Sequence, residues 1–211
     1  MVGTSSFSPS IGQLLRFDEE DSRPVAVMMC GLCGSGKSTL SHAIVAEYPS
    51  FVRLSIDGIV HEMHGVYGVD YPESMCDEYQ DEAADIFEQR LRDRLDSGGD
   101  VVLDRSFHSK EDRDYFRKLI ESGGGRVVLL YMKPPDKEKL WARVQQRKSH
   151  KHALHGEKLG DAAVETSRET FDVYWDGFEI PEGEGAIVMS NSINGRNIVS
   201  GAEVQCPKIR S

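Results

Sequence analysis

The segment 31–38 reads GLCGSGKS, and its residue types and spacing suit the binding of phosphate groups. It fits the pattern G-x-x-x-x-G-K-[ST], in which glycines let the backbone bend so that its N–H groups face the phosphates. Lys37 supplies a mobile positive charge for the β- and γ-phosphates, and the Ser38 hydroxyl can ligate Mg²⁺. We therefore predict a nucleoside triphosphate site with Mg²⁺. The predicted contacts are Gly31, Gly34, Ser35, Gly36, Lys37, Ser38 and Thr39.

Two acidic residues follow short apolar runs that are typical of strands. Asp57 follows the run 51–56, and Asp104 follows 101–103. In an open parallel sheet, ligands bind beyond the carboxyl ends of the strands, so both side chains should face the nucleotide. Two other interpretations stay open at this point. Asp57 could cap a helix that begins at Gly58, and Asp104 could pair with Arg105 or Arg113.

The elements that must position these residues alternate along the chain. Strands are predicted over 24–30, 51–56, 101–103, 127–132 and 186–189. Helices are predicted over 39–48, 76–97, 134–148 and 161–177, with a further helix that Ser109 caps and Gly123 ends. This alternation predicts an α/β phosphate-loop three-layer sandwich, with a five-stranded parallel sheet flanked by helices.

The same pattern predicts the domain organisation. Residues 24–190 should form one domain, with a helical lid over about 136–177. Residues 1–23 are expected to be a flexible leader, although its apolar stretch 11–17 could instead form a helical turn that packs on the domain. Residues 191–211 are polar, contain two Gly and a Pro, and are expected to be a tail.

Composition and charge indicate which classes of protein and of substrate fit this chain. The chain has 211 residues, of which 39% are hydrophobic and 28% charged, and a net charge of −10. No apolar run approaches the roughly 20 residues of a membrane-spanning helix, and no signal peptide is visible, so we expect a cytoplasmic protein that does not act at a membrane. Nucleic-acid-binding proteins usually carry a basic field, so the acidic balance favours a small-molecule substrate. A local basic patch is still compatible with that balance.

Beyond the phosphate loop, the chain resembles one group of small P-loop kinases. The group includes polynucleotide 5′-hydroxyl kinase domains, zeta toxins and chloramphenicol phosphotransferase. The resemblance rests on Ser55-Ile56-Asp57 after the second strand, and on VVLD at 101–104 followed nine residues later by Arg113. It extends over about residues 24–190, through Arg143 and Arg147, which are similar to the lid arginines of the group.

The resemblance implies roles for these side chains. Asp57 would be the general base, and a carboxylate with a pKa near ~4 is indeed ionised at neutral pH. Arg143 and Arg147, one helical turn apart, would offset charge on the transferring phosphoryl group, or else belong to a solvated helix face. Asp104 would hold Mg²⁺ through a water or orient the substrate, and Arg105 and Arg113 would lie on the substrate side.

One departure from the group bears on the acceptor. Its polynucleotide kinases tend to carry an arginine three residues after the base, where this chain has Val60. His61, His64 or Arg105 could substitute for it. The acceptor end is predicted over 61–72 and on the face of the long helix, where three tyrosines could stack on a ring or simply pack. They are Tyr67, Tyr71 and Tyr79.

The sequence thus predicts an ATP-dependent kinase that acts on a hydroxyl of a small molecule, such as a nucleoside, sugar or antibiotic. No N-K-x-D motif of a GTPase is present. Two alternatives remain: a polynucleotide 5′-hydroxyl kinase, and a non-catalytic ATP-binding switch. Cys30 and Cys33 have C-x-x-C spacing but no second pair, which argues against a zinc site. The oligomeric state is left open between monomer and dimer.

Overall fold

The computed structural model describes Leu15, residues 21–153 and residues 167–190. Its strands are β1 (Val25–Cys30), β2 (Val52–Leu54), β3 (Val101–Leu103), β4 (Arg126–Lys133) and β5 (Ile187–Ser190). They form one five-stranded sheet in the order β2-β3-β1-β4-β5, and all neighbouring strands run parallel. The predicted five-stranded parallel sheet is therefore confirmed.

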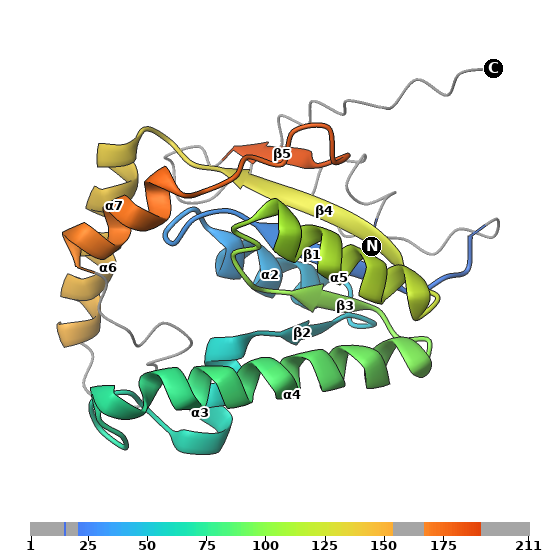
Figure 1. Cartoon of the computed structure of the whole chain (residues 1–211), viewed down its shortest axis with the longest axis horizontal. Helices are drawn as coiled ribbons and strands as arrows, with labels where there is room; N and C mark the ends of the chain where they lie inside the picture. Colours follow the sequence, from blue (N-terminus) through green and yellow to red (C-terminus); the bar gives the residue numbers. More distant parts are fainter. Residues whose placement is uncertain (1–14, 16–20, 154–166, 191–211) are drawn as a thin grey trace, which may run out of the picture.

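Helices cover both faces of this sheet, as Figure 1 shows: α4 and α5 lie on one face and α2 on the other. The helices are α2 (Lys37–Glu47), α3 (Ile56–His64), α4 (Cys76–Asp96), α5 (Lys110–Ser122), α6 (Lys137–Ala153) and α7 (Arg168–Asp176), with a short 3₁₀ helix η1 (Glu73–Met75) before α4. The predicted α/β layering is confirmed. The sequence offered helix α3 only as an open interpretation, with a start at Gly58, whereas the helix begins at Ile56 and buries Ile59 and Val60.

Several predictions concern residues outside this description. The leader over 1–23 is described only at Leu15 and from residue 21 onward, and the tail over 191–211 lies outside the described residues. The helix predicted over 161–177 is described from Ser167, its N-cap, and it begins at Arg168.

The central strand β1 is buried on both faces, which explains why its sequence is continuously apolar. Because side chains alternate along a strand, its residues divide between two hydrophobic clusters. Ala26, Met28 and Cys30 pack with α4 and α5, whereas Val27 and Met29 pack with α2. The sheet thus has a core on each side, and β1 holds the two cores together.

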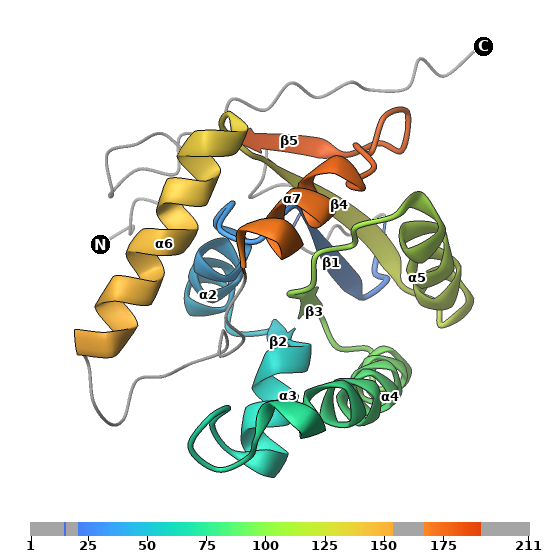
Figure 2. The same cartoon turned by 60° about the vertical axis from the view of Figure 1, so that its left-hand side comes forward.

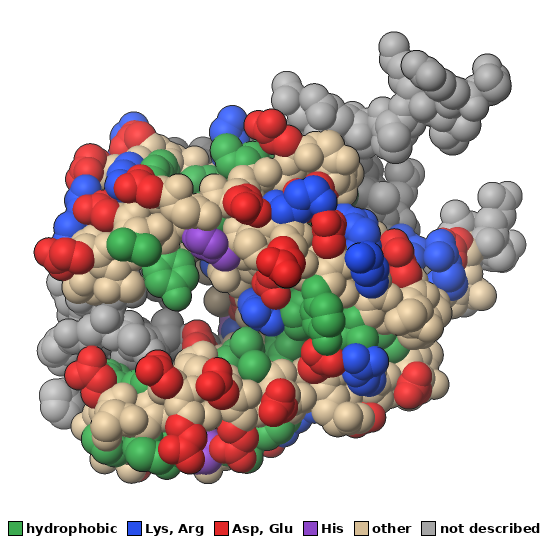
Figure 3. Space-filling model, in the orientation of Figure 1, with side chains coloured by type: hydrophobic (Ala, Val, Ile, Leu, Met, Phe, Trp, Pro, Cys, Tyr) green, Lys and Arg blue, Asp and Glu red, His purple; other side chains and the backbone are tan. Residues whose placement is uncertain are grey.

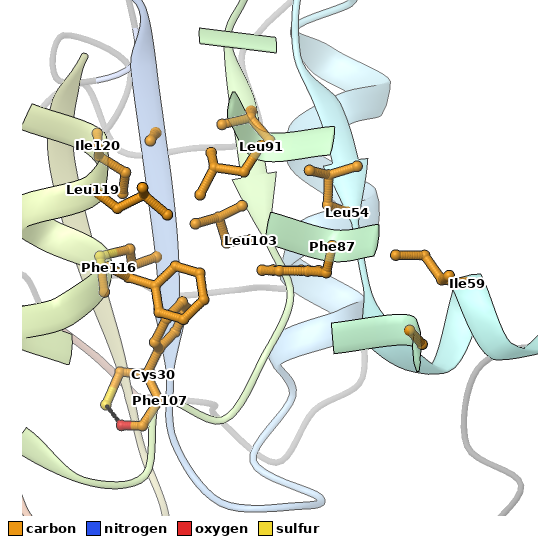
Figure 4. Close-up of a cluster of buried hydrophobic side chains, with 14 of the residues drawn as sticks. Cys30, Leu54, Ile59, Phe87, Leu91, Leu103, Phe107, Phe116, Leu119 and Ile120 are labelled. Carbon is orange, nitrogen blue, oxygen red and sulfur yellow. Dashed lines mark hydrogen bonds between the residues drawn. The ribbon is translucent and has the colours of Figure 1, made fainter. Parts of the chain in front are cut away.

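The larger core lies between the sheet and the helices α4 and α5. Figure 4 shows Phe87 and Leu91 of α4 and Phe116 of α5 pointing toward Leu103 of β3. Phe87 meets the Phe116 ring edge-on, with 5.9 Å between the ring centroids. These contacts fix the long helix α4 against the strands that end at the candidate site.

Two serines begin the helices that follow β2 and β3. The Ser55 hydroxyl accepts a hydrogen bond from the Gly58 N–H at 3.1 Å, and Ser109 does the same for the Asp112 N–H at 3.1 Å. The predicted cap at Ser109 is confirmed. The interpretation of Asp57 as a helix cap is wrong, because Ser55 occupies that position and leaves Asp57 in the first turn of α3.

Within the described ranges, none of the helices has the length and apolar character needed to cross a bilayer.

We expect Phe87→Ala to destabilise the protein by ~3–5 kcal/mol, because it opens a cavity where the side chain is fully buried. Chemical denaturation, followed by circular dichroism, measures the change in the free energy of unfolding. Val69→Ala is the matched control, since Val69 is 77% exposed and its truncation should change stability by no more than about 0.5 kcal/mol. Equal losses in the two variants would contradict the packing described for α4.

Candidate functional site

The carboxyl ends of β1, β2 and β3 lie at one edge of the sheet, and each is followed by predicted site residues. The phosphate loop leaves β1 directly after Cys30. Gly31 has φ 144, and a Cβ there would lie 2.9 Å from the carbonyl oxygen of Met132, so the first position of the loop tolerates only glycine. Gly36, with φ 105, makes the last turn before α2 in the same left-handed region.

The loop delivers the N-terminus of α2 to this edge. Helix α2 begins at Lys37, has no side-chain cap and has no acidic residue in its first turn. Its first N–H groups and its positive end therefore suit an anion. Lys37 Nζ donates to the carbonyl of Leu32 at 3.0 Å, which folds the lysine back over the loop. Ser38 is half-buried and Thr39 is exposed, both in the first turn of α2.

Ser35 lies inside the loop. Its side chain is buried, and its N–H donates to the Leu32 carbonyl at 3.2 Å. This turn brings the backbone from Leu32 to Gly36 into a compact arch, which is the form that the predicted phosphate contacts require.

Asp57 stands exposed at the end of β2, on the first turn of α3. Gln80 of α4 donates a long hydrogen bond from Nε2 to Asp57 Oδ1 at 3.4 Å. Tyr71 is also close: burial raises the pKa of its hydroxyl, and Cys76 and Asp57 add to the rise. The exposed carboxylate thus lies between α3, α4 and the loop that carries Tyr71.

Asp104 pairs with Arg53, a partner that the sequence did not predict. Arg53 of β2 donates to Asp104 Oδ2 from Nε at 2.9 Å and from Nη2 at 2.6 Å. The two side chains are 13% and 3% exposed. The suggested pairing of Asp104 with Arg105 or Arg113 is therefore wrong. The register of the two strands explains this pairing. Arg53 of β2 lies beside Val102 of β3, within reach of the carboxylate that follows β3.

Arg113 is buried inside the fold, which argues against its prediction as a substrate contact. Its side chain is 0% exposed and forms two hydrogen bonds to Glu184, at 2.8 and 2.7 Å. Burial by itself would lower the pKa of the guanidinium, but the bonds to Glu184 outweigh this effect and raise it. Arg105 is partly exposed, pairs with Asp112 at 3.2 Å and lies 5.0 Å from the Phe116 ring centroid.

Helices α6 and α7 lie together beside the phosphate loop, as Figure 2 shows. Leu140 and Val144 of α6 pack with Phe171 of α7 and with Leu32 of the loop. A Cβ on Gly34 would lie 3.0 Å from Val144 Cγ2, so α6 rests on the loop itself. We call α6 and α7 the lid.

The lid carries the two predicted arginines. Arg143 is half-buried and directly precedes Val144, the residue that touches Gly34. Arg147 follows one turn later in α6, and its side chain lies outside the described part. The backbone of α6 therefore brings the Arg143 position close to the phosphate loop.

The predicted acceptor end contains a cluster of aromatic rings. His64 of α3 stacks on Tyr79 of α4 with 3.6 Å between centroids, and Tyr71 meets Tyr79 edge-on at 5.1 Å. His64 Nε2 also lies 2.9 Å from Glu82 Oε2. Tyr67 meets Tyr71 edge-on at 5.9 Å. Packing between these rings ties α3 to α4 and so fixes the helix that carries Asp57.

This end of the molecule also carries the negative charge. Between Arg53 and Arg90 the chain has ten acidic residues and no lysine or arginine. The whole chain has 35 acidic and 25 basic residues, so the remainder balances at 25 of each. Figure 3 shows acidic side chains along α4, on one side of a hollow that separates it from the lid. The ten are Asp57, Glu62, Asp70, Glu73, Asp77, Glu78, Asp81, Glu82, Asp85 and Glu88.

Comparisons with known proteins agree with this geometry. The family model described as "AAA domain" matches residues 27–174, and no curated protein matches the chain. A suspected kinase from Chloroflexus aurantiacus is similar in structure, with a TM-score of 0.62, 16% identity, and coverage of 81% of this chain and 89% of that one. The predicted resemblance to this group of P-loop kinases is confirmed.

Two further solved structures share the fold. The PezAT toxin–antitoxin system of Streptococcus pneumoniae aligns with a TM-score of 0.54, 14% identity, and coverage of 87% of this chain and 73% of that one. The Pnkp1/Rnl/Hen1 RNA repair complex aligns with a TM-score of 0.52 and 18% identity, over 74% of this chain but only 47% of that one. At these sequence identities, the similarity shows a shared fold alone.

Two cysteines at the phosphate loop should differ in reactivity. Burial raises the pKa of the Cys30 thiol to about 11, whereas Cys33 is exposed. We expect iodoacetamide at pH 8 to alkylate Cys33 well before Cys30, because the thiolate is the reactive form. Peptide mass mapping over time measures this. Mg-ATP should slow alkylation of Cys33. The variant Cys33→Ser is the control, because it lacks the thiol that should react first. Faster labelling of Cys30 than of Cys33 would contradict the described burial.

Proposed function

This chain belongs to the AAA domain family, and from that premise we propose that it is an ATP-dependent kinase that phosphorylates a hydroxyl of a small molecule. The supporting observation is the common edge of the sheet, to which β1 delivers Lys37 and the loop, and β2 delivers Asp57. A nucleotide bound in the loop would then have an ionisable carboxylate on the neighbouring side of its γ-phosphate.

In this proposal, different elements of the chain take part in transfer of the γ-phosphoryl group. Backbone N–H groups of the loop and Lys37 hold the phosphates. Asp57 accepts the proton of the acceptor hydroxyl while the hydroxyl oxygen forms a bond to the γ-phosphorus. At the same time, the bond between the γ-phosphorus and the bridging β–γ oxygen breaks. ADP leaves with that electron pair. Arg143 and Arg147 stabilise the charge on the transferring group from the lid, and Arg105 remains a candidate contact on the substrate side.

Magnesium fits this site as an ion bound largely by phosphates and water. Among the described residues, no group of three or more His, Cys, Asp or Glu could hold a metal ion. Mg²⁺ needs no such cage, because it often takes one or two protein ligands beside nucleotide phosphates. Ser38 would bind it directly, and Asp104 would act through a water, with Oδ2 engaged by Arg53. Bound there, the ion would neutralise charge on the β- and γ-phosphates.

The charge of the acceptor end argues for a small acceptor over a polynucleotide. Asp57 belongs to the segment that carries ten carboxylates without a lysine or arginine. A polyanionic strand would meet repulsion here, because the segment offers no lysine or arginine for the phosphate contacts that dominate its affinity. Val60 also replaces the arginine expected in a polynucleotide kinase of this group.

The test is transfer of label from γ-labelled Mg-ATP to a pooled set of acceptors. The pool contains nucleosides, sugars, amino alcohols and a 5′-hydroxyl oligonucleotide. Label on a small acceptor supports the proposal, whereas label on the oligonucleotide alone replaces it with the polynucleotide alternative. Tight ATP binding with neither transfer nor hydrolysis would favour the non-catalytic switch.

We expect Asp57→Asn to lower transfer by about 10²–10⁴-fold, because the amide cannot accept the hydroxyl proton. The dissociation constant for Mg-ATP, measured by calorimetry, should change little. Glu62→Gln is the matched control, since it removes one exposed charge from the same helix α3 and should leave transfer nearly unchanged. Equal losses in the two variants would assign the effect to charge alone and contradict the role of Asp57.

A further inference from the structure

The turn Ser106–Phe107–His108, between β3 and α5, is fastened to the phosphate loop. The Gly31 N–H donates to the Ser106 carbonyl at 2.9 Å, at the point where the loop begins. One residue earlier, the Cys30 thiol lies 3.5 Å from the Phe107 carbonyl oxygen, as drawn in Figure 4. The turn therefore shares two contacts with the last residue of β1 and the first of the loop.

The same turn holds the lid. His108 Nε2 lies 2.8 Å from the Tyr174 carbonyl oxygen in α7. Because a carbonyl only accepts, Nε2 must carry the hydrogen. After α7, the Glu179 N–H donates to the His108 carbonyl at 3.1 Å, and the Phe178 ring meets the His108 ring edge-on at 5.5 Å. The C-terminal end of α7 is thus attached to the turn by side chain and backbone together.

A buried ion pair keeps this turn in place. Phe107 is fully buried at φ 45, which is uncommon for a non-glycine residue. Arg113 donates from Nη1 to the Phe107 carbonyl at 2.9 Å, while Glu184 fixes the rest of the guanidinium. Arg113 therefore supports the backbone that joins the phosphate loop to α7.

Helix α7 in turn is joined to α6. The Phe171 ring lies 5.1 Å from Trp141, and Phe171 shares a buried cluster with Leu140 and Val144. Arg168 of α7 forms two hydrogen bonds to Glu138 of α6, at 2.9 and 2.6 Å. A displacement of α7 should therefore be passed to α6 and to Arg143.

We propose that His108 is a positioning residue that, through its hydrogen bond to the Tyr174 carbonyl, fixes the lid and the Arg143 position relative to the phosphate loop. His108 contacts neither nucleotide nor acceptor in this assignment. Its effect on turnover rests on the proposed kinase function, but its effect on the lid does not.

The first test measures the positioning through Arg143. Hydrolysis of Mg-ATP, with water as acceptor, is compared in His108→Ala, Arg143→Ala and the double variant. We expect His108→Ala to lower kcat about tenfold, since small misplacements of a reacting geometry cost up to ~10²-fold, with KM for ATP within about twofold. In the Arg143→Ala background, where only Arg147 remains on the lid, His108→Ala should lower kcat by clearly less than tenfold. Multiplying effects would overturn the proposal.

His108→Gln separates this role from loss of the ring. The glutamine Nε2 can reach the same carbonyl and donate to it, so we expect kcat to return to within about threefold of the parent protein. His42→Ala, on an exposed position of α2, is the matched control and should leave kcat unchanged. Failure of His108→Gln to recover kcat beyond the level of His108→Ala would overturn the proposal.

Hydrogen exchange gives a reading that does not need turnover. In His108→Ala, amides of α7 should exchange at least about tenfold faster, whereas those of α4 should not change. Unchanged exchange in α7 would overturn the proposal. If the parent protein neither hydrolyses Mg-ATP nor transfers label to any acceptor, the kinase proposal fails, and the exchange rates of α7 still decide the role of His108.

Discussion

The fold depends on the complete burial of β1. This strand lies at the centre of the sheet, its side chains are divided between two cores, and all six of its residues are buried. The chain that leaves its carboxyl end cannot continue between the layers, so it turns at once at Gly31, where only glycine avoids the Met132 carbonyl. The rigid strand and the tight turn together aim the phosphate loop and the start of α2 at one edge of the sheet. Asp57 and Asp104 follow strands that end at the same edge.

Two buried ion pairs stabilise the backbone around the site in different ways. Arg53–Asp104 joins the ends of β2 and β3, while Arg113–Glu184 supports the turn that touches both the phosphate loop and α7. Removing one partner of such a pair leaves a buried charge, which typically costs ~3–5 kcal/mol, although the intact pair contributes little net stability. Their value here lies in geometry, since each fixes polar backbone or carboxylate positions that apolar packing alone would leave less defined.

Negative charge is distributed unevenly along the chain. The segment between Arg53 and Arg90, which overlaps the predicted acceptor end, contains the whole excess of negative charge, whereas α6 carries Arg143 and Arg147. This division suits a reaction in which an anionic donor is held by the loop and the lid, and the acceptor approaches from a side that repels other anions. The acidic composition of the chain is therefore a local feature, because the excess of acidic residues lies in the segment that contains Asp57.

The sequence alone determined the elements with strong periodicity and the residues in short, rigid motifs. The apolar run of β1, the G-x-x-x-x-G-K-S loop and the acids after β2 and β3 predicted the parallel sheet and the edge that carries the candidate site, because each signal is local. Side-chain partners were decided by tertiary structure. Arg53 meets Asp104 only through strand register, Arg113 turns inward to Glu184 seventy-one residues away, and His108 reaches α7 across the fold. Such contacts depend on which strands become neighbours and on which helix packs above them. The spacing of residues along the chain predicts neither the strand order nor the helix packing.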